Sequence, residues 1–496
     1  PEVTRVNLKG SLPPWVSAKD VVLKLLEIFT TRGNVGHVFE YGGEGLEGLA
    51  VPERATIANM GAEMGLTTSV FPSDGMTRRF LAAQAREADW AELSADPDAE
   101  YARDVELDLS GLVPLAARPH SPDNIGAVRE LAGIPVDQVC IGSCTNSSYR
   151  DLATVARILR GKVAHPRVSL IITPGSRQVL ENLARDGYLA DLLAAGARLT
   201  ESSCGFCIGG SHSPGSKGVS LRTSNRNFYG RSGTEDAEVY LVSPETAAAA
   251  AVAGAVTDPR DLGMDFPAVA MPEAFRVDDC MILEPAPPGK AASVQIVRGP
   301  NIGSPPENGP LPERLDGEVT LKVGDKITTD HIMPAGARMK YRSNIPRYAD
   351  YVFEGLDPTF PSRAARIRDS GRHNVVVAGQ SYGQGSSREH AALCPMYLGV
   401  KAVIAKSYER IHAANLINFG IVPLVFENES EYNLLDQGDV LEIAGLRDAL
   451  GSGGPLTVRN ATKGRSFTVT CTLSERQRRI VLAGGALNLV KGKRPE

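Results

Sequence analysis

Long apolar runs are missing from this sequence: no stretch approaches the roughly 20 apolar residues of a membrane-spanning helix. An excess of one charge is also missing, because 53 Lys and Arg residues face 58 Asp and Glu residues, giving a net charge of −5. Without a basic stripe a nucleic-acid partner is not expected, and without an apolar span neither is a membrane. The composition is that of an ordinary globular protein, and 496 residues are enough for about two to four domains.

Cysteine is scarce as well. The seven cysteines are odd in number and scattered, which is not the pattern of a secreted disulfide framework. A reducing compartment is favoured, and we therefore expect a cytoplasmic protein. No signal or transit peptide is visible; the sequence opens at Pro1, without an initiator Met, and soon enters a helix for which Ser17 is the expected N-cap.

Apolar strand patterns alternate with helical patterns along most of the sequence, which predicts an α/β fold. Buried strands are expected at "DQVCIGSC", "RVSLIITPGS", "HNVVVAGQ", "VKAVIAKS" and "FGIVPLVF". Helices are expected at "SSYRDLATVARILRG" and "RQVLENLARDGYLADLLAAGA". A Pro- and Gly-rich segment interrupts this rhythm and exceeds the usual length of a loop within a domain. We expect domains at residues 1–115, 116–285 and 316–496, with a linker at 286–315.

The sharpest chemical signal is "SSCGFCIGG", which contains Cys204-x-x-Cys207, together with Cys144 in "GSCTNSS". Both segments follow predicted strands, and open α/β sheets bind ligands at the carboxyl ends of their strands. A redox-active dithiol would leave Cys144 unexplained, and a zinc site would need His212 as a fourth ligand. An iron–sulfur cluster on three cysteines would leave one iron open to substrate. Unconnected buried cysteines are the fourth alternative.

Several polar motifs accompany the cysteines, each of them more often structural than functional when it occurs alone. Arginines stand in the loop "SNRNFYGRSG", and "IANMGAEMG" puts Asn59 and Glu63 on one face of a predicted helix. An Asp-His pair and a further arginine lie in "ITTDHIMPAGARMKYRSN". The turn "YGQGSSREHAAL" presents two serines and an arginine before a predicted helix.

Taken together and in their order, these motifs identify a family. "GSCTNSSYRD", "CGFCIGG", "SNRNFYGR", "TTDHIMPAGA" and "GQGSSREHAAL" resemble the aconitase superfamily of iron–sulfur hydro-lyases, and its bacterial-type members above all. The resemblance covers essentially the whole sequence. It implies a multi-domain α/β fold in which a long linker joins a swivelling C-terminal α/β domain. In that family a further domain lies before the position of Pro1, so a separate or missing N-terminal domain is an expected partner.

The resemblance implies a role for each motif residue. A 4Fe–4S cluster is expected on Cys144, Cys204 and Cys207, with Asn225 near it. The residues expected to bind a tricarboxylate substrate are Arg226, Arg231, Arg342, Ser387, Arg388 and Asn59. The residues expected to act in catalysis are Ser386, as the base that takes a proton from carbon, with Asp330 and Glu63. A serine base needs its alkoxide stabilised, which the N–H groups of a glycine turn, a helix N-terminus and a guanidinium can do.

The activity that the resemblance implies is that of an aconitate hydratase, which interconverts citrate and isocitrate through cis-aconitate. Homoaconitase, 2-methylcitrate dehydratase and 3-isopropylmalate dehydratase are alternatives within the same chemistry. Arg342 favours a tricarboxylate, because isopropylmalate carries an alkyl group in place of the extra carboxylate. RNA binding by a cluster-free form is a more distant alternative, and the net charge of −5 argues against it.

Overall fold

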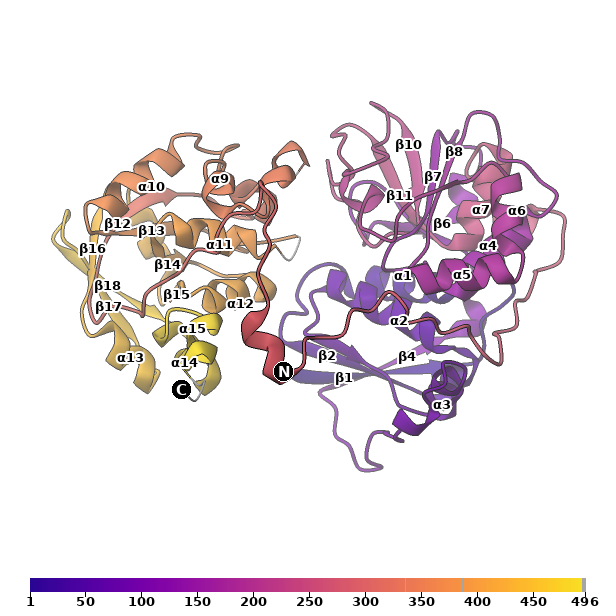
Figure 1. Cartoon of the computed structure of the whole chain (residues 1–496), viewed down its shortest axis with the longest axis horizontal. Helices are drawn as coiled ribbons and strands as arrows, with labels where there is room; N and C mark the ends of the chain where they lie inside the picture. The colour runs from indigo at the N-terminus through magenta and orange to yellow at the C-terminus, as the bar shows by residue number, and fades with distance from the viewer. Residues whose placement is uncertain (335, 386–387, 493–496) are drawn as a thin grey trace. The chain divides into compact units, whose positions relative to one another are not determined.

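The computed structural model describes residues 1–334, 336–385 and 388–492. The chain forms two compact units, Pro1–Pro285 and Ala286–Glu496, and both are built from mixed strands and helices (Figure 1). The α/β fold class predicted from the sequence is therefore confirmed. In the described part of the chain, no helix combines the length and the apolar character that crossing a membrane requires.

The first unit begins with a four-stranded parallel sheet in the order β3-β2-β1-β4. Its strands are β1 (Glu2–Lys9), β2 (His37–Gly42), β3 (Thr68–Val70) and β4 (Arg103–Asp108), and the helices along this stretch are α1 (Ala18–Phe29), α2 (Val51–Gly61) and α3 (Gly75–Ala82). Ser17 caps α1 as predicted, since the backbone N–H of Ser17 donates to Asp20 Oδ2 at 2.8 Å.

A seven-stranded sheet follows in the order β6-β5-β11-β10-β7-β8-β9, and β11, β10, β7, β8 and β9 run parallel. Its strands are β5 (Leu115–Ala117), β6 (Ile125–Ala127), β7 (Gln138–Gly142), β8 (Ser169–Thr173), β9 (Arg198–Leu199), β10 (Val219–Arg222) and β11 (Glu238–Val242). The accompanying helices are α4 (Tyr149–Leu159), α5 (Arg177–Arg185), α6 (Tyr188–Ala194) and α7 (Pro244–Ala253). Both sheets lie in the first compact unit. The domain boundary at residues 115 and 116 stays a prediction.

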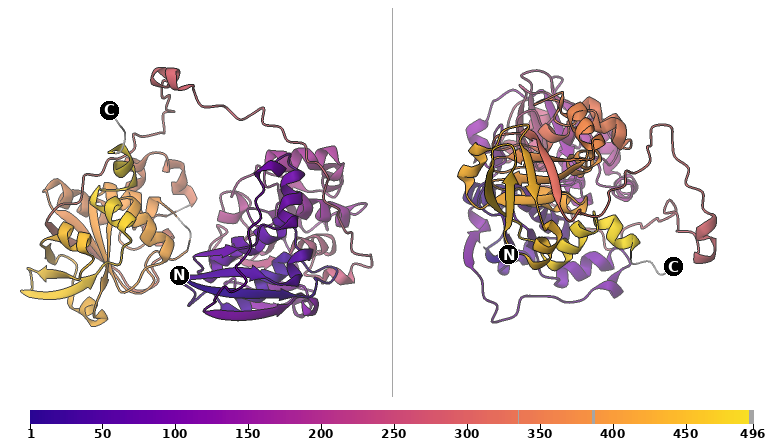
Figure 2. Two further views of the ribbon diagram at one scale, coloured as in Figure 1. Left: turned by 90° about the horizontal axis from the view of Figure 1, so that it is seen from below. Right: turned by 90° about the vertical axis from the view of Figure 1, so that its left-hand side faces the viewer.

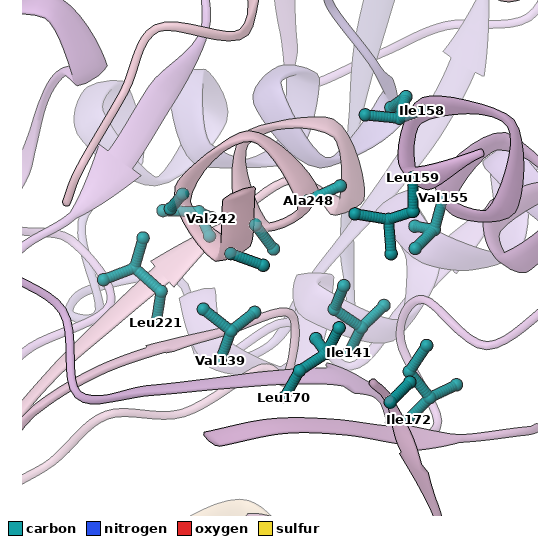
Figure 3. Close-up of a cluster of buried hydrophobic side chains, with 14 of the residues drawn as sticks. Val139, Ile141, Val155, Ile158, Leu159, Leu170, Ile172, Leu221, Val242 and Ala248 are labelled. Carbon is teal, nitrogen blue, oxygen red and sulfur yellow. The ribbon is translucent and has the colours of Figure 1, made fainter. Parts of the chain in front are cut away.

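The core of this second sheet explains why the central strands read as continuous apolar runs. Val139 and Ile141 of β7 lie with Leu170 and Ile172 of β8 opposite side chains of α4 and α7, and all are buried (Figure 3). A parallel sheet covered by helices has no solvated face, so its strands lose the alternation of apolar and polar residues.

One predicted helix is in fact two. The apolar pattern of "RQVLENLARDGYLADLLAAGA" predicts a single helix, but α5 ends at Arg185 and α6 begins at Tyr188. Gly187 between them has φ 81°, in the left-handed region that an α-helix does not contain. The prediction of one continuous helix is therefore wrong.

The second unit is a closed barrel in the order β12-β13-β14-β15-β18-β17-β16, in which β12 to β15 run parallel. Its strands are labelled in Figure 1. Its strands are β12 (Leu315–Lys322), β13 (His373–Ala378), β14 (Val400–Ala405), β15 (Val422–Phe426), β16 (Val440–Ile443), β17 (Leu456–Asn460) and β18 (Arg465–Thr470). Its helices are α8 (Thr329–Ile332), α9 (Ile345–Ala349), α10 (Phe360–Asp369), α11 (His390–Tyr397), α12 (Arg410–Asn418), α13 (Leu446–Ser452), α14 (Glu475–Leu482) and α15 (Ala486–Lys491).

The segment before β12 is extended and exposed. Between residues 286 and 310 its regular structure is the 3-10 helix η8 (Pro288–Ser293), and the trace runs outside the barrel (Figure 2). Its Pro and Gly content accounts for this, since Pro removes backbone donors and both residues disfavour helix and strand interiors. The limits of the linker at 286 and 315 stay a prediction.

Replacing Gly142 by Ala is expected to destabilise the first unit. Gly142 has φ 135°, and a Cβ atom there would lie 2.1 Å from the carbonyl oxygen of Thr173. Strain in this backbone region contributes about 1–3 kcal/mol, and overpacking contributes about 1–3 kcal/mol more. Gly161→Ala is the matched control, because φ is 72° there and a Cβ would meet no described atom within 4 Å. Urea denaturation followed by circular dichroism measures both variants, and equal losses of unfolding free energy would contradict this account.

Candidate active site

The three motif cysteines lie at one edge of the seven-stranded sheet. Cys144 follows β7, Cys204 follows β9, and Cys207 lies in the 3-10 helix η6 (Phe206–Ile208). Since β7 and β9 run parallel with β8 between them, their carboxyl ends meet at the same edge. Partial burial raises the pKa of the Cys204 thiol, and the neighbouring Cys207 and Cys144 raise it further. The three thiols therefore share one electrostatic environment.

A buried guanidinium holds the CxxC segment against the sheet. Arg222, at the end of β10, is fully buried, and its Nη2 donates to Gln138 Oε1 at 2.8 Å and to the His212 carbonyl at 3.1 Å. Its Nη1 donates to the carbonyl of Phe206, and its Nε donates to Ser220 Oγ at 2.9 Å. The loop from Phe206 to His212 is thus fixed to β7 and β10 through one side chain.

Beside the cysteines, Glu63, Arg226 and Asn225 form a buried polar cluster. Arg226 Nε donates to both carboxylate oxygens of Glu63, at 2.8 and 2.9 Å, and Asn225 Nδ2 donates to Glu63 Oε1 at 3.0 Å. Asn225 Oδ1 lies 3.9 Å from Cys207 Sγ. Burial raises the pKa of Glu63, and Arg226 opposes this shift. Burial alone would lower the pKa of Arg226, but Glu63 raises it, so the guanidinium keeps its charge.

Asn59 and Glu63 do not share an α-helix, contrary to the sequence prediction. The helix α2 ends at Gly61, and Glu63 lies in the 3-10 helix η2 (Ala62–Met64). Asn59 Oδ1 instead accepts a hydrogen bond from Thr145 Oγ1 at 3.1 Å, directly after Cys144 in the chain. A 3-10 helix has fewer residues per turn than an α-helix, so i, i+4 spacing no longer puts Asn59 and Glu63 on one face. Glu63 contacts Arg226 instead.

Arg231, the other arginine of the loop, has an unsatisfied donor. Its Nε is buried and has no hydrogen-bond partner among the residues that the structure describes. The charge of Arg231 acts on two other residues of the site. Burial raises the pKa of Glu63 and of Cys204, and Arg231 lowers both values. A buried guanidinium N–H without a partner is the donor that an anionic ligand satisfies.

The predicted residues of the second unit form a separate group. Arg388 pairs with Asp330, and its Nη1 also donates to the Met333 carbonyl at 3.0 Å. Arg342 is exposed, and its backbone carbonyl oxygen lies 2.8 Å from His390 Nε2. Ser386 and Ser387 lie outside the described residues.

The turn that precedes the two serines is held by backbone contacts. Gly383 N donates to the Ile327 carbonyl at 2.8 Å, and Thr329 N donates to the Gln384 carbonyl at 2.9 Å. Gly383 has φ 89°, and a Cβ there would lie 2.2 Å from Cγ of the buried His412. Only glycine fits this position, which accounts for the first glycine of the motif.

Two buried cations of the site, Arg222 and Lys19, were not predicted from the sequence, and Lys19 is the one that a sequence pattern could have revealed. Its side chain is fully buried in α1, and burial lowers its pKa to about 7 even though Cys144 and Asp20 oppose the shift. The helical spacing of Lys19 with Val22, Leu23 and Leu26 could have revealed it, because these three residues are all buried. A lysine on the apolar face of a helix needs a partner in the interior.

The three thiols are sulfur ligands of the kind that an iron–sulfur cluster takes. Over residues 1–334, 336–385 and 388–492, no three His, Cys, Asp or Glu side chains converge so as to hold one metal ion. In an iron–sulfur cluster each thiolate binds a different iron, so the sulfur atoms stand apart. The cations Lys19 and Arg226 are both electrostatically coupled to Cys144 and Cys207, which favours the negative charge of thiolate ligands.

A multi-domain α/β protein with three coupled thiols at a sheet edge has the features of a metallocluster enzyme. The profile of the Aconitase family (aconitate hydratase) matches residues 1–132 and 125–254, and that of the Aconitase C-terminal domain matches residues 326–429. The chain therefore belongs to the aconitase family, as its motifs predicted. Members of this family are hydro-lyases that generally use an iron–sulfur cluster, and this chain is an enzyme of that class.

Individual relatives are similar over nearly all of the chain. A mitochondrial homocitrate dehydratase of Saccharomyces cerevisiae is 34% identical over 99% of this chain and 71% of its own length. A putative mitochondrial aconitate hydratase of Aspergillus fumigatus is 35% identical over 99% of this chain and 70% of its own, and the mitochondrial aconitate hydratase of S. cerevisiae is 33% identical over 99% and 71%.

Among solved structures, a 3-isopropylmalate dehydratase (leuD) of Methanocaldococcus jannaschii matches 36% of this chain and 94% of its own, with 30% identity. The TM-score of 0.30 is too low to support an argument from it.

These relatives overturn the expectation of a cytoplasmic protein. The homocitrate dehydratase and both aconitate hydratases are mitochondrial proteins, so the prediction is wrong. It was based on the few scattered cysteines, which indicate reducing surroundings without distinguishing one such compartment from another.

A buried carboxyl group of the first unit makes the free energy of unfolding depend on pH. Burial, with a smaller contribution from the nearby acids Asp20, Asp151 and Glu53, raises the pKa of Glu245 to about 8. Between pH 4.5, the ordinary value, and about pH 8 the folded state therefore binds more protons than the unfolded chain, so this contribution to stability is lost as the pH rises.

Glu245→Gln is expected to remove this dependence. The variant should flatten the curve of unfolding free energy against pH and exceed the wild type at pH 8.5 by on the order of a few kcal/mol. Denaturant titrations between pH 5 and 9 measure the curve, with the exposed Glu235→Gln as control. A Glu245→Gln curve parallel to that of the wild type would show that this carboxyl is not buried as the structure has it.

Proposed function

We propose that the chain is an aconitate hydratase, which interconverts citrate and isocitrate by removing and returning water through cis-aconitate. The observation that carries the proposal is the group of three coupled thiols beside the buried Glu63–Arg226 pair and the unsatisfied Nε of Arg231. Thiols supply ligands for a cluster, and guanidinium groups supply two-pronged binding sites for carboxylates. Both are what a hydro-lyase acting on a multiply charged acid needs.

In this proposal Cys144, Cys204 and Cys207 hold a 4Fe–4S cluster. When bound, such a cluster with one open iron supplies a Lewis acid toward the hydroxyl group that leaves. Asn225 lies between Cys207 and Glu63 and orients both side chains. Glu63 can carry a proton at this edge, because burial raises its pKa.

Arginines bind the substrate carboxylates in the proposed reaction. In the first unit, the proposed carboxylate-binding residues are Arg226, Arg231 and Asn59. In the second unit, they are Arg342, Arg388 and Ser387. Ser386 removes the proton from carbon, and Asp330 orients Arg388 through their ion pair. Because Arg388 already donates to the Met333 carbonyl, its guanidinium is held in one orientation before substrate arrives.

A homocitrate dehydratase is the second candidate. The relatives named for aconitate and for homocitrate are 33–35% identical to this chain, so similarity alone does not separate the two substrates. 2-Methylcitrate and 3-isopropylmalate are further alternatives within the same chemistry. Isopropylmalate is disfavoured, because the third carboxylate that Arg342 is proposed to bind is an alkyl group in that substrate.

The cluster proposal predicts that anaerobically reconstituted protein takes up iron and sulfide on three cysteines. Cys144→Ser, Cys204→Ser and Cys207→Ser should each abolish the visible iron–sulfur absorbance, because each removes one of three thiolate ligands. Cys280→Ser is the matched control, since Cys280 is an exposed free thiol elsewhere. Bound zinc that His212→Ala removes would contradict the proposal.

The substrate proposal predicts a severe loss of citrate turnover in Arg342→Lys. A lysine supplies a point charge but not the two parallel donors of a guanidinium. Loss of a charge-assisted contact costs about 1.5–3 kcal/mol, or roughly ten- to a hundredfold in kcat/KM. Arg347→Lys, in the exposed start of α9, is the control. Steady-state kinetics with citrate, homocitrate and isopropylmalate separate the candidates: unchanged citrate kinetics, or preference for isopropylmalate, would refute the assignment.

A further inference from the structure

Lys19 stands out among the buried charges of the first unit. Its Nζ donates to the carbonyl oxygens of Thr223 at 2.9 Å and Ser224 at 2.7 Å, directly after β10. The side chain is 0% exposed. An ammonium group is strongly hydrated and almost never fully buried unless it is paired, so this position needs an explanation in the interior.

The carboxylates near Lys19 are engaged with other groups. Asp20 accepts from the backbone N–H of Ser17 and of Leu115, each at 2.8 Å. Asp151 accepts from the backbone N–H of Ser148 at 3.0 Å and from the Ser148 hydroxyl at 2.7 Å. The direct partners of the ammonium are thus neutral carbonyl groups, which satisfy two of its three donors and leave its charge uncompensated by direct contact.

Thr223 and Ser224, which accept hydrogen bonds from Lys19, connect to the loops that carry Cys144 and Cys207. Thr223 Oγ1 accepts from the backbone N–H of Gly142 at 2.8 Å, two residues before Cys144. Ser224 precedes Asn225, whose Oδ1 lies 3.9 Å from Cys207 Sγ. The end of β10 is therefore the point at which the Cys144 loop and the Cys207 loop are joined.

We propose that Lys19 is a positioning residue for the metallocluster: it fixes the Thr223–Ser224 backbone between the cysteine loops and sets a positive charge beneath the thiolate ligands. This inference rests on the proposed function, since it requires a cluster on the three cysteines. Thiolate ligands carry negative charge, and a nearby fixed cation stabilises the more negative, reduced form of a cluster.

The electrostatics around Lys19 support the inference. Burial lowers the pKa of Lys19, while Cys144, Asp20, Asp151 and Cys207 all raise it. Lys19 and the two thiols therefore act on each other, and the groups that raise the pKa of the ammonium include two of the three proposed ligands.

The experiment is a redox titration of the reconstituted holoprotein. Lys19→Met removes the charge and keeps the length of the side chain, Lys19→Arg keeps the charge, and Lys24→Met is the control. Lys24 lies on the same helix, partly exposed and paired with Glu27. Lys19→Met should bind iron and sulfide in the wild-type ratio. The equilibrium constant for reduction of its cluster should be about tenfold smaller, which corresponds to a midpoint potential about 59 mV more negative. Lys24→Met and a folded Lys19→Arg should match the wild type.

Each other outcome decides the question. A loaded Lys19→Met protein with an unchanged midpoint would overturn the inference and leave the proposed function intact. A wild type that takes up no cluster would overturn the proposed function, and the inference with it. A merely structural lysine would lower the unfolding free energy without moving the midpoint.

A measurement on the wild type covers the case in which Lys19→Met does not fold. In protein labelled with ¹⁵N-lysine, the protected Nζ signal of Lys19 should broaden when the cluster is loaded and reduced by one electron to its paramagnetic state, while that of Lys24 should not. An unchanged Lys19 signal in loaded, reduced protein would overturn the inference.

Discussion

The burial of the Arg222 guanidinium is the constraint on which the site depends. A charge in the interior requires partners for its donors, and Arg222 finds them in Gln138, Ser220 and the carbonyls of Phe206 and His212. Satisfying this one group holds the CxxC loop against β7 and β10, where Phe206 and Cys207 pack on Cys140 and Ile171. The face of the Phe206 ring also lies against the guanidinium, with its centroid 5.6 Å from Cζ, so the same side chain anchors the loop by packing and by hydrogen bonding.

Besides Arg222, the first unit buries further charged side chains of both signs in its interior. Arg226 is balanced by Glu63, whereas the hydrogen-bond partners of Lys19 in the described part of the chain are the carbonyl groups of Thr223 and Ser224. Buried acids such as Glu245 carry raised pKa values because burial disfavours their ionised forms. Lys19 and Arg226 both act electrostatically on Cys144 and Cys207, and positive charge near the thiols suits the binding of an anionic cluster and an anionic substrate.

Much of the fold could be predicted because it depends on local pattern. The apolar runs of β7 and β8, the cap at Ser17 and the cysteines after the strands all follow from residues close together in the chain. The break at Gly187 did not, since the φ of one residue decides it, and neither did the change from α-helix to 3-10 helix before Glu63. Lys19 and Arg222 escaped prediction for another reason: the carbonyls that hold Lys19 lie 204 and 205 residues away, and single-sequence patterns carry no such pairing.

The central claim is that the carboxyl edge of the seven-stranded sheet carries an iron–sulfur cluster on three cysteines. An anomalous difference map at the iron absorption edge, from crystals of anaerobically reconstituted protein, tests it directly. The account predicts one compact multi-iron peak in contact with the sulfur atoms of Cys144, Cys204 and Cys207, next to Asn225. A map without iron at this edge, or a peak that appears at the zinc edge with His212 as a ligand, would contradict it.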